Sequence, residues 1–404
     1  MRFFKSNRIK LSFFLCYIVC IAALIIACDR PLNNSTLSSS HSVNCIQNYN
    51  PNTDYFPKKA NINYATGFSV EYQNNYKLVT VKNPYPDAKT SLKYVLVQCG
   101  TPAPEGFKQD RVITVPVNTV ASLSTTHLPH LAKLELVDKL IGVSNLKIVN
   151  TPEVVEQIKA GKIAELGNNN VNLEQLLDQA PDLVTTYGTG NLQTDSHPKL
   201  LEAGLKVAIN AEYMENTPLG RSEWLKFTAL FFNQEEKAEQ VFSAIGKNYQ
   251  EIAAKTKAIT KRPKVFTGFN FKGTWYVPGC QSYLAQYLAD AGAELLCVGN
   301  SFGSIPSSFE NIFERAATAD YWLNVSQSWQ NLQDVIREDS RYSDFKAVQK
   351  GNVYNNNARL NKNGGNDYWE GGISNPDLIL ADLINIFHSE LLPNHQLFFY
   401  QKLN

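Results

Sequence analysis

One long amphipathic segment, from Asn233 to about residue 259, constrains this chain of 404 residues more than any other stretch. Apolar residues recur there at three- and four-residue spacing, and the next proline is Pro263. Asn233 followed by Glu236 is typical of a capping box, so we expect the helix to begin there. Alternating strand and helix patterns lie on both sides. The segment therefore predicts a rigid helix joining two lobes; the alternative is a surface helix of a single domain.

The length of the chain also favours two lobes, because 404 residues exceed the size at which one hydrophobic core keeps growing. Hydrophobic residues make up 44% of the sequence and charged residues 19%, as in ordinary soluble globular proteins. The formal net charge is only +1, and the sequence has no basic stripe. These features predict no nucleic-acid partner.

The first 28 residues have the pattern of a secretory leader. An apolar run from residue 11 to 27 ends in Ala27-Cys28, and it follows four basic residues, Arg2, Lys5, Arg8 and Lys10. This pattern predicts a signal peptide at 1–27, since the run is short for the alternative, a membrane-spanning helix. Residues 24–28 resemble a bacterial lipobox, in which the cysteine is lipidated. The resemblance implies an extracytoplasmic protein anchored to the cell membrane through lipidated Cys28, on the periplasmic side if the organism is Gram-negative.

Four of the seven cysteines remain after the leader and the lipidation site are set aside. They would lie in an oxidising compartment, where disulfides form. Sequence alone does not fix their pairing, although Cys280 and Cys297 fall in one lobe and could pair; Cys45 and Cys99 are the others. Neither a CxxC motif nor another metal-ligand spacing is present, so we predict no metal site.

Changes in composition along the chain predict its organisation. Residues 28–61, rich in Asn, Ser, Pro and Thr, predict a flexible tether. Alternating apolar runs within 62–97 predict a β-hairpin and a third strand, of open role, at the start of a first lobe at 62–232. Strands alternate with helices in the rest of that lobe and again in 261–404, beyond the linking helix at 233–260. The predicted fold class is α/β, with two wound lobes joined by one long helix and a ligand cleft between the lobes.

The order of these elements resembles the substrate-binding proteins of ABC importers, in the class with a long linking helix that handles iron-siderophore, haem and cobalamin. Residues 111–116 through 140–143 are similar to the family's opening strand–helix–strand, and residues 172–174 with 180–184 are similar to its helix-then-strand signature. The resemblance covers about residues 112–387. It implies a protein without enzyme activity or intrinsic cofactor, which captures an iron chelate (a ferric siderophore, or haem or cobalamin) and delivers it to ABC permease and ATPase subunits.

Two acidic residues occupy matching places in the two lobes. Glu174 and Glu310 each lie in the first turn of a predicted helix that feeds a strand. An acid in that position could merely complement the helix dipole. In the family that the chain resembles, an acidic residue on each lobe docks onto arginines of the permease. Carried over by position, the docking residues are Glu174 and Glu310.

The ligand site is expected between the lobes, in loops at the carboxyl ends of the strands. A glycine-flanked loop at 355–372, rich in amide and aromatic side chains, is of this kind, although its aromatic residues could instead belong to the core. Aromatic and arginine side chains would suit a large, flat or anionic chelate. The candidate contacts in the first lobe are Ser124, Thr125, Thr126, Tyr187, Thr189 and Arg221, and those in the second lobe are Asn270, Trp275, Tyr276, Trp329, Arg359, Tyr368 and Trp369.

A secreted α/β-hydrolase is an alternative function. Residues 299–303, Gly-Asn-Ser-Phe-Gly, match the G-x-S-x-G nucleophile elbow and would make Ser301 the nucleophile. His388 and His395 lie downstream, as the order of such a triad requires. Pro306 stands where the helix of the elbow would grow, which argues against this interpretation.

Two further interpretations stay open at this point. His127 and His130 are candidate metal or haem ligands, although Pro129 between them favours ordinary positions in a loop and at a helix start. A lipid-anchored interaction protein without a transport role is a third functional class. Charge reversal at Glu174 and Glu310 would distinguish this class from a transport protein. In a transport protein the reversal should abolish uptake and leave ligand binding intact.

Overall fold

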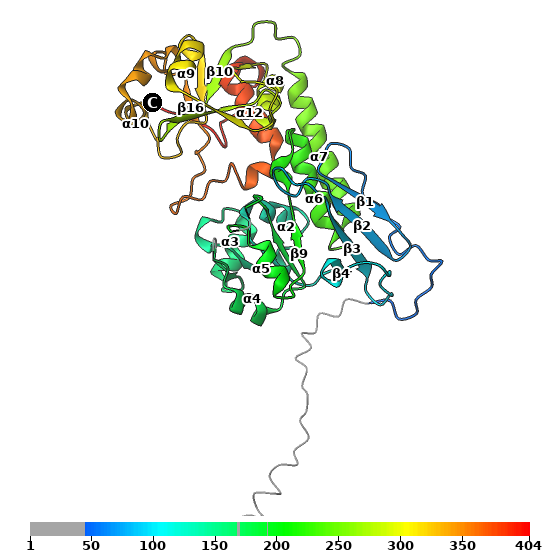
Figure 1. Cartoon of the computed structure of the whole chain (residues 1–404). Helices are drawn as coiled ribbons and strands as arrows, with labels where there is room; N and C mark the ends of the chain where they lie inside the picture. Colours follow the sequence, from blue (N-terminus) through cyan, green and yellow to red (C-terminus); the bar gives the residue numbers. More distant parts are fainter. Residues whose placement is uncertain (1–44, 168–169, 192) are drawn as a thin grey trace, which may run out of the picture. The chain divides into compact units, whose positions relative to one another are not determined.

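A computed structural model describes residues 45–167, 170–191 and 193–404 (Figure 1). The predicted signal peptide, the lipidation site at Cys28 and the first part of the predicted tether lie outside the described residues. Within those ranges, no helix is long and apolar enough to cross a membrane.

The first lobe is built on a sheet of five parallel strands in the order β7-β6-β5-β8-β9. Its strands are β5 (Val120–Ser122), β6 (Leu140–Val143), β7 (Ala164–Glu165), β8 (Leu183–Thr186) and β9 (Val207–Ile209). The helices between them are α2 (Leu128–Lys133), α3 (Pro152–Lys159), α4 (Leu173–Gln179) and α5 (His197–Glu202). The sheet confirms the predicted alternation of strands and helices.

The second lobe has a separate sheet in the order β13-β10-β15-β16-β17, parallel except for its last strand. The strands are β10 (Lys264–Thr267), β13 (Glu294–Leu295), β15 (Tyr321–Leu323), β16 (Val353–Asn355) and β17 (Gln401–Lys402). A small antiparallel sheet adds β11 (Asn270–Phe271), β12 (Thr274–Pro278) and β14 (Ser304–Ser307). The helices are α8 (Tyr283–Asp290), α9 (Phe309–Ala316), α10 (Leu332–Glu338), α11 (Lys346–Gln349) and α12 (Pro376–Phe387).

Short 3-10 helices complete the connections in both lobes. They are η2 (Gln109–Arg111), η3 (Thr125–His127), η4 (Val137–Lys139), η5 (Leu146–Ile148), η6 (Glu212–Met214), η7 (Ser340–Asp344), η8 (Gly371–Ser374) and η9 (Ser389–Leu391). Several of them follow strands directly, so they carry the loop residues discussed below.

A third sheet, which we call the N-terminal sheet, precedes the first lobe. Its strands run in the order β1-β2-β3-β4 and are β1 (Phe68–Tyr72), β2 (Tyr76–Val81), β3 (Leu92–Gln98) and β4 (Val112–Val115). The hairpin and third strand were predicted, but the place of β4 was not. Residues 112–115, within the predicted opening segment 111–116, pair with β3 instead of opening the first lobe, and β5 is the opening strand of that lobe.

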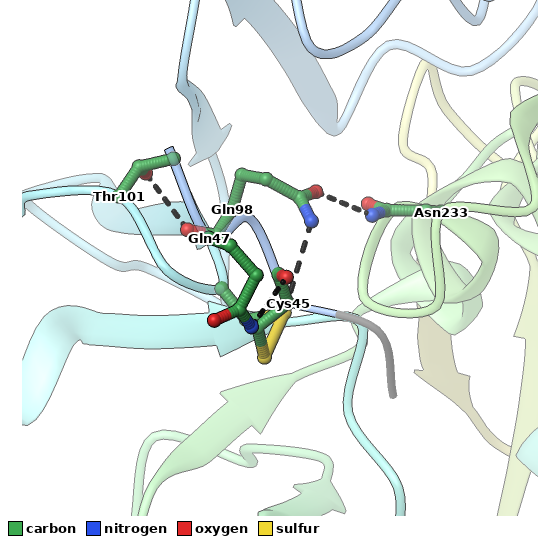
Figure 2. The surroundings of a disulfide bond; sticks show 6 residues. Cys45, Gln47, Gln98, Thr101 and Asn233 are labelled. Atoms are coloured by element: carbon green, nitrogen blue, oxygen red, sulfur yellow. Dashed lines mark hydrogen bonds between the residues drawn. A yellow bond between two sulfur atoms is a disulfide. The ribbon is translucent and has the colours of Figure 1, made fainter. Parts of the chain in front are cut away.

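The predicted tether is too long, because residues 45–61 are packed against the N-terminal sheet. A disulfide joins Cys45 to Cys99 at the end of β3 (Figure 2). Phe56 and Ala60 are buried, and the Ala60 N–H donates a hydrogen bond to Tyr72 Oη at 3.0 Å. Anchoring by one cysteine and a few apolar side chains therefore orders a segment of polar composition. The second disulfide joins Cys280 to Cys297 within the second lobe.

The predicted linking helix is α7 (Glu235–Ala254), of 20 residues, and it follows α6 (Pro218–Leu230), whose residues are all buried. The prediction of a long helix is confirmed, but its start is wrong. Asn233 adopts a left-handed conformation with φ 54°, and its side chain contacts Lys77 and Gln98 instead of capping the helix. The helix also ends before the expected residue 259.

Helix α7 packs against α6 and against α12 of the second lobe. Phe242, Ile245 and Tyr249 of α7 belong to a hydrophobic cluster that contains residues of both lobes. The two lobes are therefore joined by a shared core as well as by the chain itself.

Candidate ligand-binding site

A cavity of about 420 Å³ lies at the carboxyl ends of β5, β6 and β8, the position where parallel α/β sheets bind ligands. Most of its lining side chains carry hydroxyl groups, so we call it the hydroxyl pocket. Its lining residues are Leu123, Ser124, Thr125, Ser144, Ile148, Thr186, Tyr187, Thr189, Thr194, Asp195 and Ser196.

A second cavity, of about 320 Å³, shares Ser124, Tyr187 and Thr189 with the hydroxyl pocket. We call it the Glu212 pocket, and its lining residues are Pro86, Ser124, Thr126, Tyr187, Thr189, Glu212 and Tyr213. The two neighbouring pockets bring together five of the six contacts predicted in the first lobe. The hydroxyl pocket is lined by the first lobe alone, and the Glu212 pocket by the first lobe and Pro86, which lies between β2 and β3; none of the second-lobe candidates lines either pocket.

Local hydrogen bonds hold the hydroxyl groups in place after β5. Ser124 is the N-cap of η3, and its Oγ lies 2.9 Å from Thr126 Oγ1. Ser122 Oγ donates a hydrogen bond to the carbonyl oxygen of Ser124 at 2.9 Å. A chain turn fixed in this way presents several hydroxyl groups to one cavity.

Asp195 organises the loop after β8. It is 4% exposed, and its carboxylate accepts hydrogen bonds from Thr189 N at 2.8 Å, Gly190 N at 3.0 Å and Thr189 Oγ1 at 2.7 Å. Sequence reasoning missed this residue. The sequence signal that could have indicated it is an aspartate a few residues after Gly-Thr-Gly, because aspartate side chains commonly accept hydrogen bonds from the backbone of their own loop.

Glu212, at the start of η6, was also missed. Its side chain is 2% exposed, and it lines the Glu212 pocket. Burial raises the pKa of this carboxyl, while the nearby Arg221 guanidinium acts in the opposite direction. Neither pocket is lined by Lys or Arg in the part of the chain that the structure describes, so their ionisable groups are Asp195, Glu212 and two tyrosines.

Arg221 does not join the other predicted contacts of the first lobe. It is buried in α6, with its guanidinium carbon 4.5 Å from the ring centroid of Tyr283. With Tyr368 and Trp369 it lines a separate crevice of about 10 Å³, which is room for about one water molecule. Arg221 and Tyr368 therefore line neither of the two larger pockets, because both side chains are packed at the contact between α6 and the second lobe; their role as ligand contacts stays a prediction.

Two predicted aromatic contacts of the second lobe are core residues. Trp275 is 0% and Trp329 4% exposed, within an aromatic cluster around Trp322. The Trp275 indole N–H donates to Thr267 O at 2.8 Å, so its polar atom is satisfied inside the protein. Aromatic composition had suggested a cleft, but it does not reveal which side of a sheet a residue covers.

The other second-lobe candidates lie outside the two pockets. Asn270 is half-buried on β11, where its backbone N–H donates to Tyr342 Oη, and Tyr276 is exposed on β12. Arg359 forms an ion pair with Asp367, with 2.5 Å between Nε and Oδ2. The side chain of Trp369 is partly exposed beside the Arg221 crevice.

The geometry around Ser301 does not form a nucleophile elbow. Strand β14 follows residues 299–303 where the elbow requires a helix, and Ser301 Oγ accepts a hydrogen bond from Gly303 N at 3.1 Å. His388 Nε2 contacts the carbonyl oxygen of Gly292, and His395 Nε2 lies 2.6 Å from Asp382 Oδ1. The hydrolase alternative is therefore wrong in the order of its structural elements.

His127 and His130 are buried residues of the first lobe. Their Nδ1 atoms contact Thr185 Oγ1 and Thr228 Oγ1, and burial lowers the pKa of each imidazole to about 3. Both rings are therefore neutral near pH 7. Across the described ranges, no group of three or more His, Cys, Asp or Glu residues could hold a metal ion.

Two wound sheets, a shared helical core and a pocket at the strand ends define a two-lobe solute-binding protein. The sequence model of the periplasmic binding protein family matches residues 120–360, which is more than half of the chain. The chain therefore belongs to the periplasmic binding protein family. The matched range begins at β5, so the N-terminal sheet lies outside it.

Known proteins similar to this chain include an uncharacterized lipoprotein of Methanocaldococcus jannaschii, which is 28% identical over 374 residues, with 85% of each chain covered. Among solved structures, a possible iron-binding (periplasmic solute-binding) protein from Staphylococcus epidermidis aligns with a TM-score of 0.53 and 19% identity, covering 67% of this chain and 98% of its own. A periplasmic heme-binding protein from Pseudomonas aeruginosa has a TM-score of 0.53 and 16% identity, with coverage of 71% and 98%. These structures share the fold.

Proposed function

We propose that the protein is the lipid-anchored, extracytoplasmic binding component of an ABC importer, and that its cargo is an iron chelate: a ferric siderophore, haem or cobalamin. The hydroxyl pocket at the carboxyl ends of β5, β6 and β8 carries the proposal. Its volume lies within the range of small-molecule sites. The names of similar proteins, which include a lipoprotein and proteins described as binding iron or haem, support the same assignment.

In this function the protein binds and releases its cargo without covalent chemistry. Hydroxyl groups of Ser124, Thr125 and Thr189 would replace water around the polar atoms of the chelate. Because Asp195 holds Thr189 in place before the ligand arrives, little side-chain freedom would be lost on binding. Glu174 and Glu310 would then orient the loaded protein on the permease, and lipid on Cys28 would keep it at the membrane surface.

The test begins with protein recovered from native membranes and analysed by native mass spectrometry for a bound small molecule. Calorimetric titration of the ligand-free protein with a ferric trihydroxamate, haemin and cyanocobalamin follows. We expect saturable binding of at least one of them, weakened about tenfold or more by Ser124→Ala combined with Thr189→Val. Ser328→Ala, which removes an exposed hydroxyl elsewhere, is the matched control. Failure of all three chelates to bind would contradict the proposed cargo.

A further inference from the structure

The N-terminal sheet reaches the candidate ligand site through residues 82–91, the loop between β2 and β3, which we call the β2–β3 loop. We infer that this loop is a fixed wall of the Glu212 pocket and helps to decide which ligands fit. The inference rests on the proposed function in one respect, since it takes the two pockets as the ligand site. It assigns a role to a sheet that lies outside the range matched by the family.

Pro86 places the β2–β3 loop at the pocket directly. It is exposed and lines the cavity together with Thr126, Glu212 and Tyr213 of the first lobe. The exposed surface of this cavity is mostly apolar although its other residues carry hydroxyl and carboxyl groups, and the Pro86 ring adds to that apolar surface. The wall therefore favours a ligand that has an apolar edge beside its polar atoms.

Tyr85 connects the same loop to the segment that carries two pocket residues. A Cβ atom added at Gly188 would lie 3.1 Å from Tyr85 Cδ1, and one added at Gly190 would lie 3.2 Å from the carbonyl oxygen of Pro86. The absence of side chains at these two positions lets the loops approach closely. Tyr187 and Thr189, which line both pockets, alternate with these glycines along the chain. The contact with Tyr85 thus holds Tyr187 and Thr189 in position.

Further contacts extend this packing on both sides of the segment. The Tyr85 ring stacks on His197 at the start of α5, with 6.3 Å between the ring centroids. Tyr213 Oη donates a hydrogen bond to the carbonyl oxygen of Gly188. The β2–β3 loop, the loop after β8 and the start of η6 therefore form one contiguous packed unit.

The N-terminal sheet itself is firmly anchored, so its loop acts as a preformed wall. Tyr94 Oη, on β3, accepts a hydrogen bond from Ile209 N at 2.9 Å, at the end of β9 and three residues before Glu212. The carboxylate of Glu215 accepts bonds from Gly67 N at 2.7 Å and from Trp224 Nε1 at 2.9 Å. Figure 1 shows the sheet beside α6 and α7, which agrees with these contacts. A rigid wall discriminates between ligands by steric exclusion.

The test compares the full chain with its Tyr85→Ala/Pro86→Ala variant by two measurements. Hydrogen–deuterium exchange of residues 187–190, without ligand, should be about tenfold faster in the variant. The ratio of affinities for a ferric trihydroxamate, haemin and cyanocobalamin should change by about tenfold or more. Tyr85→Phe, which keeps the ring, and Lys89→Ala, an exposed residue of the same loop, should both behave as wild type.

The two measurements separate this inference from the proposed function. If the wild-type chain binds none of the three probes, the proposed cargo is wrong, and the exchange measurement alone decides the role of the loop. Unchanged exchange at 187–190 overturns the inference in every case. Faster exchange with unchanged affinity ratios overturns it as well, because the loop would then stabilise the segment without selecting ligands.

Discussion

Lys77 of β2 and Glu235 of α7 form an ion pair in the protein interior, with 2.5 Å between Nζ and Oε1 and side-chain exposures of 0% and 4%. The ammonium group also donates to Asn233 Oδ1 at 2.8 Å and to the carbonyl oxygen of Leu230 at 2.6 Å. All three donors of the lysine are therefore used. The pair ties the N-terminal sheet to the first turn of the helix that joins the lobes.

Removing one partner of this pair should destabilise the protein strongly. Burial lowers the pKa of Lys77, and the charge of Glu235 opposes that shift. We expect Lys77→Met to reduce the free energy of unfolding by about 3–5 kcal/mol, because it leaves a buried carboxylate without its partner. Urea denaturation at pH 7 measures the change.

The double variant Lys77→Met/Glu235→Leu supplies the control for the ion pair. It removes both charges, so most of the lost stability should return, as is common when apolar side chains replace a buried pair. Lys58→Met measures the effect of removing a lysine from an exposed ion pair, because Lys58 pairs with Glu236 at the surface. This substitution should change the free energy of unfolding by less than about 1 kcal/mol. A double variant as unstable as the single one would contradict a charge-based explanation.

Much of the fold could be predicted because the hydrophobic periodicity follows the backbone geometry. The long amphipathic run predicted α7, and the alternation of strand and helix patterns predicted both wound sheets. Other features depend on partners that periodicity does not reveal. Residues 112–115 pair with β3, and the three-residue strand β5 holds the central place in the first lobe. Asn233 lies outside the helix, and its amide oxygen accepts a hydrogen bond from Lys77, which is distant in sequence.

The candidate site divides in the same way. Ser124, Thr126 and Thr189 could be predicted, since residues that follow parallel strands gather at one edge of the sheet. Asp195 and Glu212 could not, because their importance comes from burial within folded loops. Trp275 and Trp329 were wrongly placed in the cleft because a tryptophan suits an interior and a binding surface equally well.

Glu370 links the two lobes through a buried carboxylate. It lies in the loop at 355–372 of the second lobe and accepts hydrogen bonds from Thr151 N and Thr151 Oγ1, both at 2.6 Å, and from Asn150 N at 3.0 Å. Burial raises its pKa from 4.5 to about 7, and the neighbouring Asp367 acts in the same direction. The loop that the sequence suggested as a ligand-presenting segment is thus partly a bridge to the start of α3.

The raised pKa of Glu370 predicts a pH dependence of stability. The native state keeps the proton between pH 4.5 and 7 while the unfolded state has lost it, so the free energy of unfolding should fall as pH rises through this window. The contribution is about 3 kcal/mol, at about 1.4 kcal/mol per pH unit. Glu370→Gln, which cannot titrate, should lack this contribution. Urea denaturation of both proteins from pH 4.5 to 8 measures it, and a constant difference between them would contradict the prediction.

The charges around the two pockets predict a preference for cargo without a large negative charge. Asp195 and Glu212 are the acids that line these pockets, and no lysine or arginine of the described residues lines either pocket. Hydroxamate groups balance the charge of ferric iron, whereas a ferric tricatecholate keeps a large negative charge. We therefore expect the trihydroxamate to bind at least about tenfold more tightly at pH 8, because like charges oppose association. Glu212→Gln should narrow the difference in affinity between the two chelates. Tighter binding of the tricatecholate than of the trihydroxamate by the wild-type protein would contradict the prediction.

Glu174 and Glu310 occupy equivalent positions in the two lobes, each in a helix that leads into a strand of its sheet. Glu174 is exposed in the first turn of α4, which leads into β8 beside β5, and Glu310 is exposed in the first turn of α9, which leads into β15 beside β10. Both helices are capped in the same way, by Asn172 Oδ1 and Ser308 Oγ. The helix dipole accounts for an acid at each place, but a pair of equivalent exposed acids also suits a partner with two related docking positions.

Reversing both charges, with Glu174→Arg and Glu310→Arg, should abolish importer-dependent uptake of the cargo while its dissociation constant stays within about twofold. Both side chains lie on exposed helix ends away from the two pockets, so the change should affect docking and leave capture intact. Glu310 also contacts Arg341, with 3.6 Å between Oε1 and Nη1, and docking as proposed would require this contact to break. Uptake in cells and calorimetry on the purified protein measure the two effects, with Glu314→Arg on the same helix as the control. Uptake that survives the double reversal would remove these residues from the docking surface.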